Sequence, residues 1–141
     1  MREPYTQLYV HIVWATWDRL PLLSGEREAM VYACIQAECA ELGAEMIAIG
    51  GKEDHVHVLA RIPATLSVAA LVKQIKGSSS HLVNHTGAPG DVFKWQGAYG
   101  AFTVSKAAVP KVLDYVVRQK EHHSEGNVHE SFEVCGADTG E

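Results

Sequence analysis

The segment HVHVLARI, residues 55–62, constrains the fold of this chain most strongly, because an apolar side chain stands at every second position from Val56 to Ile62. Successive side chains of a β-strand point to opposite faces, so the alternation predicts a strand with two different faces. One face carries Val56, Val58, Ala60 and Ile62, and the other carries His55, His57, Leu59 and Arg61. We therefore expect the valine face to pack against helices and both imidazoles to point away from them.

The pair His55 and His57 allows two interpretations. Buried polar side chains are usually hydrogen-bonded core residues, and two such histidines would need no further role. Residues i and i+2 of a strand, however, lie about 6–7 Å apart on one face. Both rings can therefore converge on one metal ion, and the strand pattern alone leaves the choice open.

The other predicted elements surround this strand in the order β-α-β-β-α-β-α. Ser24, Ser67 and Ser105 are the expected N-caps of the three helices. The first six elements match the ferredoxin-like split βαβ plan, an α+β fold with an antiparallel sheet and two helices on one face. The last helix is extra and is available to the other face. The expected strands span 4–16, 44–51, 55–62 and 92–104, and the expected helices run to about Leu42, Asn84 and His123.

Charge is unevenly distributed along the 141 residues, whose net charge is −5. Residues 1–66 carry −4, residues 67–123 carry +4 and residues 124–141 carry −5. The basic middle part can follow a phosphate backbone locally, although a solvated lysine-bearing helix face explains it equally well. Length and composition predict one domain at 1–123, followed by an acidic tail at 124–141 that we expect to be mobile.

The sequence gives no sign of export or membrane insertion. No apolar run approaches the about 20 residues that cross a bilayer, and the first residues lack a signal-peptide pattern. Cys34, Cys39 and Cys135 are odd in number and lack the spacing of a metal site. We therefore expect reduced thiols in a cytoplasmic protein.

Tyr115 and Gln119 lie four residues apart, which places them on one face of the last predicted helix. Two imidazoles and one amide oxygen form a mixed nitrogen and oxygen site that suits Mg²⁺ or Mn²⁺ better than a structural zinc ion. Such an ion can polarise a phosphodiester for attack by the Tyr115 hydroxyl. An interfacial tyrosine beside a surface amide is the simpler alternative.

Four ordered segments together resemble the single-tyrosine HUH transposases, the group that includes insertion-sequence transposases and those associated with repetitive extragenic palindromes (REPs). The HUH motif is His55-Val56-His57, and the resemblance extends over residues 5–123. It covers HIVWATWDRLPLL, LVKQIKGSSSHLVN, KWQGAYGAFTVS and YVVRQKEHH. The resemblance implies that His55, His57 and Gln119 bind the metal ion and that Tyr115 is the nucleophile.

The same resemblance implies a dimeric enzyme that cuts and rejoins single-stranded DNA at hairpins through a 5′-phosphotyrosine intermediate. The candidate DNA contacts are Lys73, Lys76, Lys94 and Arg118 for the backbone, and Trp95 or Tyr99 for base stacking. The two aromatic residues can instead belong to the core or to a dimer interface. The net negative charge of the chain and its acidic tail differ from the basic character of the family's DNA-binding members.

Two alternatives to a transposase remain. The first is a domesticated or replication-type HUH nickase with the same chemistry, which only the flanking DNA could distinguish. The second is a non-catalytic dimeric ferredoxin-like protein that binds nucleic acid or metal. The Tyr115 and Gln119 pair argues against this second alternative, whereas the acidic charge favours it.

Overall fold

A computed structural model describes residues 4–86, 92–121 and 133–136 of the chain. Its four strands are β1 (Tyr9–Ala15), β2 (Glu45–Lys52), β3 (His55–Arg61) and β4 (Gly100–Val104). They form one antiparallel sheet in the order β2-β3-β1-β4, the strand order of the predicted split βαβ plan. The ferredoxin-like α+β prediction is therefore confirmed. The predicted turn at 87–91 lies outside the described residues.

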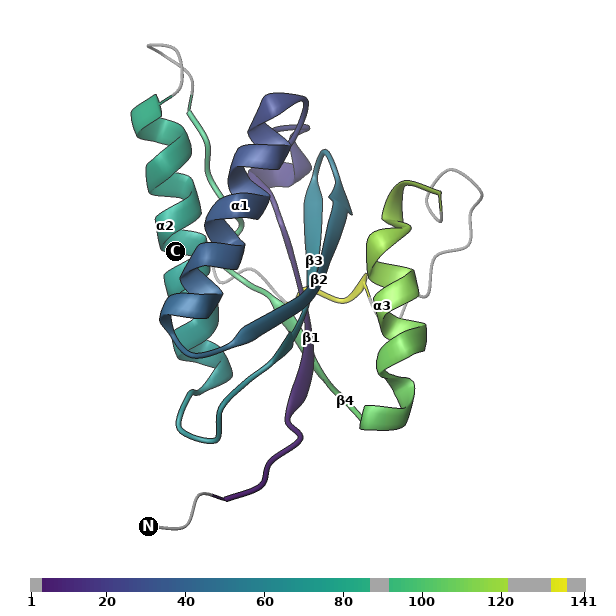
Figure 1. Cartoon of the computed structure of the whole chain (residues 1–141). Helices are drawn as coiled ribbons and strands as arrows, with labels where there is room; N and C mark the ends of the chain where they lie inside the picture. The colour runs from purple at the N-terminus through teal and green to yellow at the C-terminus, as the bar shows by residue number, and fades with distance from the viewer. Residues whose placement is uncertain (1–3, 87–91, 122–132, 137–141) are drawn as a thin grey trace.

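Three helices cover the two faces of the sheet unequally (Figure 1). Helices α1 (Glu26–Glu41) and α2 (Val68–Thr86) pack against each other on one face, and α3 (Val109–Val117) lies on the other. None of the helices in the described part of the chain is long and apolar enough to cross a membrane.

The alternation of β3 decides which residues face which helices. Its valine face belongs to a large core beneath α1 and α2, where it meets Val31, Ile35, Leu71 and Ile75. Its opposite face contributes to a small core beneath α3, which contains Ala48, Leu59, Val104, Val112 and Val116. Every residue from His55 to Ala60 is buried, so both faces of this central strand are covered, as the sequence pattern predicts.

Of the three predicted N-caps, Ser67 is confirmed, because its hydroxyl accepts a hydrogen bond from the Ala70 amide at 3.1 Å. Ser105 accepts one from the Ala108 amide at 3.3 Å, but it caps the 3-10 helix η2 (Lys106–Ala108) that leads into α3. Helix α3 itself follows Ala108 and has no side-chain cap. The prediction for Ser24 is wrong, because α1 is preceded by Gly25 at a φ of 57°, which glycine adopts without steric cost.

The last helix is shorter than predicted, because Arg118 leaves helical geometry after Val117. Residues 119–121 form one further helical turn, and the predicted helix end at His123 lies outside the described residues. Of the predicted acidic tail, the structure describes residues 133–136. Residues 133–136 lie against the sheet, close enough that a side chain added at Gly100 would overlap the Val134 carbonyl.

Candidate active site

The two histidines of β3 lie beneath α3 and are almost fully buried, with exposures of 1% for His55 and 0% for His57. In the register of the sheet, His57 stands between Val13 of β1 and Gly50 of β2. The ring centroids of His55 and His57 are 5.1 Å apart. The sheet thus holds both imidazoles on one face, as predicted from alternation.

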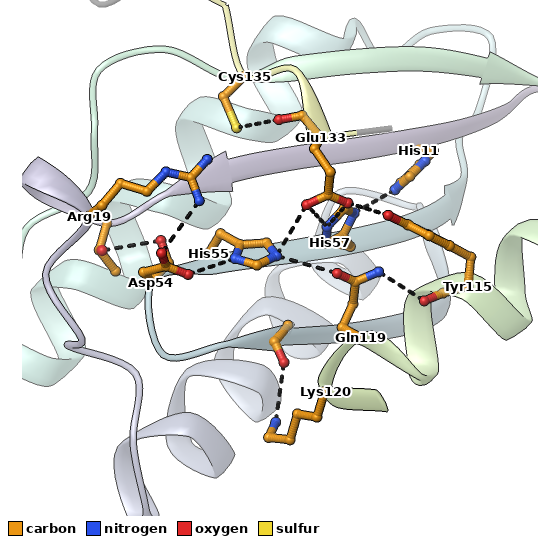
Figure 2. Close-up of polar contacts among 12 residues, drawn as sticks. His11, Arg19, Asp54, His55, His57, Tyr115, Gln119, Lys120, Glu133 and Cys135 are labelled. Atoms are coloured by element: carbon orange, nitrogen blue, oxygen red, sulfur yellow. Dashed lines mark hydrogen bonds and ion pairs between the residues drawn. The ribbon is translucent and has the colours of Figure 1, made fainter. Parts of the chain in front are cut away.

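Helix α3 brings Tyr115 to the same place, and the short turn after it brings Gln119 (Figure 2). The Tyr115 ring centroid lies 5.7 Å from that of His57. The Gln119 amide nitrogen donates to the Tyr115 carbonyl at 2.9 Å, which turns its Oε1 toward His55 Nε2 at 3.3 Å. The structure therefore brings together the four side chains that the sequence predicts for the site.

Each histidine has a second partner at its Nδ1 atom. Asp54 Oδ1 lies 2.7 Å from His55 Nδ1, and the Arg19 guanidinium lies 3.5 Å from the other carboxylate oxygen. His11 Nε2 lies 2.8 Å from His57 Nδ1. Both contacts direct the Nε2 atoms of His55 and His57 into the site, the arrangement typical of metal-binding histidines.

The charges of these partners follow from their surroundings. Hydrogen bonding to His55 lowers the pKa of Asp54 to about 2, so the carboxylate is ionised at neutral pH. Burial, followed by the influence of His57, lowers the pKa of His11 to about 4, so this imidazole is neutral. Sequence reasoning gave His11 no role, although its position on the same strand face as Val13 was readable from the alternation of β1.

Glu133 is a second site residue that sequence reasoning missed, besides His11. Its carboxylate lies 3.0 Å from His57 Nε2 and 3.4 Å from His55 Nε2, and it accepts a hydrogen bond from the Tyr115 hydroxyl at 2.5 Å. Burial alone would raise the pKa of Glu133, but hydrogen bonding to His57 and Tyr115 lowers it to about 2. A weak sequence signal existed, because the apolar residues Phe132 and Val134 flank this acid in a polar tail.

The donor atoms of the site suit a hard divalent cation. An ionised Asp54 can only accept a hydrogen bond, so the proton of a neutral His55 resides on Nδ1 and its Nε2 presents a lone pair. Gln119 Oε1 presents another lone pair to the same atom. Two acceptors that face each other are stabilised by a cation between them, and imidazole nitrogen and amide oxygen are both atoms that bind divalent ions. Ligand atoms of His55, His57 and Glu133 also lie within 4.8 Å of one another.

The predicted lysine contacts are spread over the molecule. Lys73 lines a groove between α1 and α2, on the side of the sheet opposite Tyr115. Lys76 is half-buried and donates to backbone carbonyl oxygens of segment 96–98, the nearer one at 2.6 Å. Lys94 is exposed, and its ammonium group lies 3.8 Å from the ring centroid of Trp17. The structure therefore does not gather these lysines around the buried cluster.

Arg118 and the two aromatic candidates also differ in their surroundings. Arg118 is exposed and forms ion pairs with two acidic side chains of its own segment. Trp95 is only 6% exposed and donates through Nε1 to the Ser79 hydroxyl at 2.9 Å within the large core. Tyr99 packs partly buried against the same core. For Trp95, this burial favours the alternative of a core aromatic and leaves little ring surface for a base.

Comparisons with known proteins point to one family. The family described as "Transposase IS200 like" matches residues 4–119. The transposases for insertion sequence element IS200 of Salmonella typhimurium strain LT2 and of Salmonella typhi are each 29% identical over 123 residues, covering 82% of this chain and 79% of theirs.

Two solved structures share the fold. A candidate transposase from Deinococcus radiodurans R1 has a TM-score of 0.66 at 24% identity, covering 82% of this chain and 93% of its own. A REP-associated tyrosine transposase bound to a REP hairpin has a TM-score of 0.65 at 15% identity, covering 91% of this chain and 74% of its own. At these identities the likeness describes the fold.

Proposed function

The chain belongs to the IS200-like transposase family, and from this premise we propose that it cleaves and rejoins single-stranded DNA with Tyr115 as the nucleophile. One observation carries the proposal. Tyr115, His55, His57 and Gln119 come from two distant parts of the sequence, yet they converge in one buried cluster on the α3 face of the sheet. A nucleophile beside a set of metal ligands is the arrangement that phosphodiester attack requires.

In the proposed reaction, the Tyr115 hydroxyl oxygen attacks a DNA phosphorus atom. The bond from phosphorus to the 3′-oxygen breaks, and this oxygen takes up a proton from water. The products are a free 3′-hydroxyl and a 5′-phosphotyrosine link. Glu133, which already accepts the phenolic hydrogen bond at 2.5 Å, can take the proton that Tyr115 loses. Because one phosphodiester replaces another, attack by a 3′-hydroxyl on the tyrosine link reverses the step and rejoins DNA without ATP.

We propose that His55, His57 and Gln119 hold Mg²⁺ or Mn²⁺ in this site. The cation would neutralise charge that develops on the phosphate oxygens. Asp54 and His11 position the two imidazoles so that each Nε2 faces the site. Gln119 is positioned by its own hydrogen bond to the Tyr115 carbonyl, so nucleophile and ligand depend on the same turn of chain.

The proposed substrate is a hairpin-forming single strand, in line with the REP hairpin bound by one structural neighbour. Lys94 and Arg118 are exposed candidates for phosphate contacts, as is Lys73 on the opposite side of the sheet. The homodimer remains a proposal. Within one chain Tyr115 already contacts its own His57, so a dimer would not need to exchange this helix to complete the cluster.

The central test uses labelled hairpin oligonucleotides from the genomic neighbourhood of the gene, incubated with the protein and Mg²⁺ or Mn²⁺. We expect a covalent adduct on a denaturing gel that disappears with Tyr115→Phe or a chelator and weakens with His57→Ala. Tyr5→Phe is the matched control, because Tyr5 is 80% exposed and distant in sequence from the site. Adduct formation by Tyr115→Phe would refute the nucleophile assignment.

A non-catalytic binding protein is the second candidate, and one observation favours it. Tyr115 is only 3% exposed and its hydroxyl is already bound by Glu133, as in a structural tyrosine. A protein of this kind would bind the hairpin and form no adduct under any metal condition. A domesticated nickase would form the adduct, and its gene would lack paired palindromes at the ends of a mobile unit.

A further inference from the structure

The carboxylate of Glu133 occupies the position toward which the predicted metal ligands point. Its Oε1 lies 3.2 Å from His57 Nε2 and 3.4 Å from His55 Nε2. We propose that Glu133 is a fourth protein ligand of the divalent cation, supplied by the C-terminal segment of the chain. The inference rests on the proposed function for the presence of the cation and adds a ligand that the HUH resemblance does not imply.

The spacing of the atoms fits one shared ion. Neighbouring ligands at right angles around an octahedral ion, with bonds of about 2.1 Å, lie about 3 Å apart. His55 Nε2 is 3.3 Å from Gln119 Oε1, and His57 Nε2 is 3.2 Å from Glu133 Oε1. Small movements therefore convert this cluster into a coordination shell.

The arrangement of the ligand atoms also favours a metal ion. Asp54 Oδ1 contacts Nδ1 of His55, so the opposite ring atom, Nε2, is directed into the site. This Nε2 lies 3.3 Å from Gln119 Oε1 and 3.4 Å from Glu133 Oε1. A cation at the centre attracts all three atoms, which are of the types that bind divalent ions.

Burial of Glu133 points in the same direction. Its side chain is only 16% exposed, and removing a carboxylate from water is costly unless an opposite charge or strong donors compensate. Tyr115 donates a hydrogen bond to Oε2, while Oε1 lies within 3.4 Å of the Nε2 atoms of both imidazoles. A divalent ion bound at Oε1 would add positive charge beside this buried carboxylate.

A charged fourth ligand has two consequences for the site. Two imidazoles and an amide are neutral, so Glu133 adds the one negative charge and strengthens attraction for a hard cation. The same carboxylate would connect the ion to the Tyr115 hydroxyl through its two oxygens. Four protein ligands leave about two of six octahedral positions for phosphate oxygens.

The test measures Mn²⁺ binding by the full-length protein without DNA, using isothermal titration calorimetry and the EPR signal of free Mn²⁺. For Glu133→Gln we expect an Mn²⁺ affinity at least about 10-fold lower. Even the loss of a residue that only hydrogen-bonds to a metal ligand lowers metal affinity by about 10- to 100-fold. Glu45→Gln removes an equal charge from an exposed site at the start of β2 and should leave the affinity within about twofold.

Glu133→Asp is the second variant, since it keeps the charge and shortens the side chain. We expect weakened Mn²⁺ binding there too, with a thermal melting curve like that of the parent protein. Unchanged or tighter Mn²⁺ binding in both variants would overturn the inference. So would a parent protein that binds no Mn²⁺.

The DNA adduct assay separates this inference from the proposed function. Glu133-dependent Mn²⁺ binding without an adduct from any hairpin would refute the proposed function and leave the ligand assignment intact. A Glu133→Gln variant that forms adduct faster with unchanged Mn²⁺ affinity would show instead that the carboxylate blocks the phosphate position. That outcome overturns the ligand assignment and leaves the proposed function standing.

Discussion

Gly50 of β2 lies directly against the backbone of α3, and a single methyl group there should disturb the site. A Cβ added to Gly50 would overlap the carbonyl oxygen of Val116, and it would lie 3.0 Å from the Val116 carbonyl carbon. Val116 lies between Tyr115 and Gln119 in sequence, and Gly50 is opposite His57 in the sheet. The Gly50→Ala substitution therefore acts on the junction that positions all three side chains.

The size of the effect follows from these contacts. Carbon atoms prefer separations of about 3.5–4.0 Å, so relieving the carbon contact alone moves α3 outward by about 0.5–1 Å. Overpacking of this kind costs about 1–3 kcal/mol of unfolding free energy. A displacement of about 1 Å at reacting groups can reduce a rate by about 100-fold. We therefore expect Gly50→Ala to slow adduct formation by up to about 100-fold and to lower the free energy of unfolding by about 1–3 kcal/mol.

The assay compares the initial rate of adduct formation with the free energy of unfolding in urea. Gly77→Ala is the matched control, because an added Cβ on this α2 glycine meets no atom within 4 Å. Replacing a helix-interior glycine by alanine should stabilise the protein by about 0.5–1 kcal/mol and leave the adduct rate unchanged. A Gly50→Ala protein that forms adduct at the parent rate would refute the argument that the α3–β2 junction sets the site.

Three further predictions follow from individual contacts. Ser79→Ala removes the acceptor of the buried Trp95 Nε1–H. The free energy of unfolding measured in urea should fall by about 1–3 kcal/mol, and an unchanged unfolding midpoint would contradict this. The pKa of His11 is lowered to about 4 from its ordinary 6.5, so the unfolded chain binds this proton more readily than the folded protein does. The free energy of unfolding should therefore fall as the pH drops from about 6.5 toward 4. This fall should be smaller in His11→Gln. Mn²⁺ at about 100 times its Kd should stabilise the protein by about 2.7 kcal/mol in thermal melts. That gain should be lost with EDTA and reduced in His57→Ala, and an equal shift in the variant would argue against His57 as a ligand.

Local patterns in the sequence were sufficient for the framework of the fold. Alternation along residues 55–62 correctly predicted which face of β3 meets α1 and α2, because side-chain direction in a strand depends only on position. Ser67 and Ser105 marked helix starts through hydrogen bonds that span three residues. The four-residue spacing of Tyr115 and Gln119 brought their side chains to the same place, because neighbouring turns of the chain stack on each other. This holds although α3 ends at Val117 and Gln119 lies in the turn after it.

Contacts that join distant segments were decided by the tertiary structure. Trp95 has an aromatic ring of the kind that stacks on bases, but the packing of α2 on the sheet buries this ring beside Ser79. His11 reaches His57 because β1 and β3 are neighbours in the sheet, although 46 residues separate them. Neither contact has a local signal, because each depends on which surfaces meet after the chain has folded.

The sequence by itself thus determined the sheet, the face that carries the histidines and the four side chains proposed for metal binding and attack. Only the tertiary structure added Glu133 to them, since its carboxylate reaches His57 across 76 positions of sequence. An acid in a polar tail is indistinguishable from its solvated neighbours until folding removes it from water. Burial beside two imidazoles and a phenol then gives that one carboxylate partners and a distinct chemical environment.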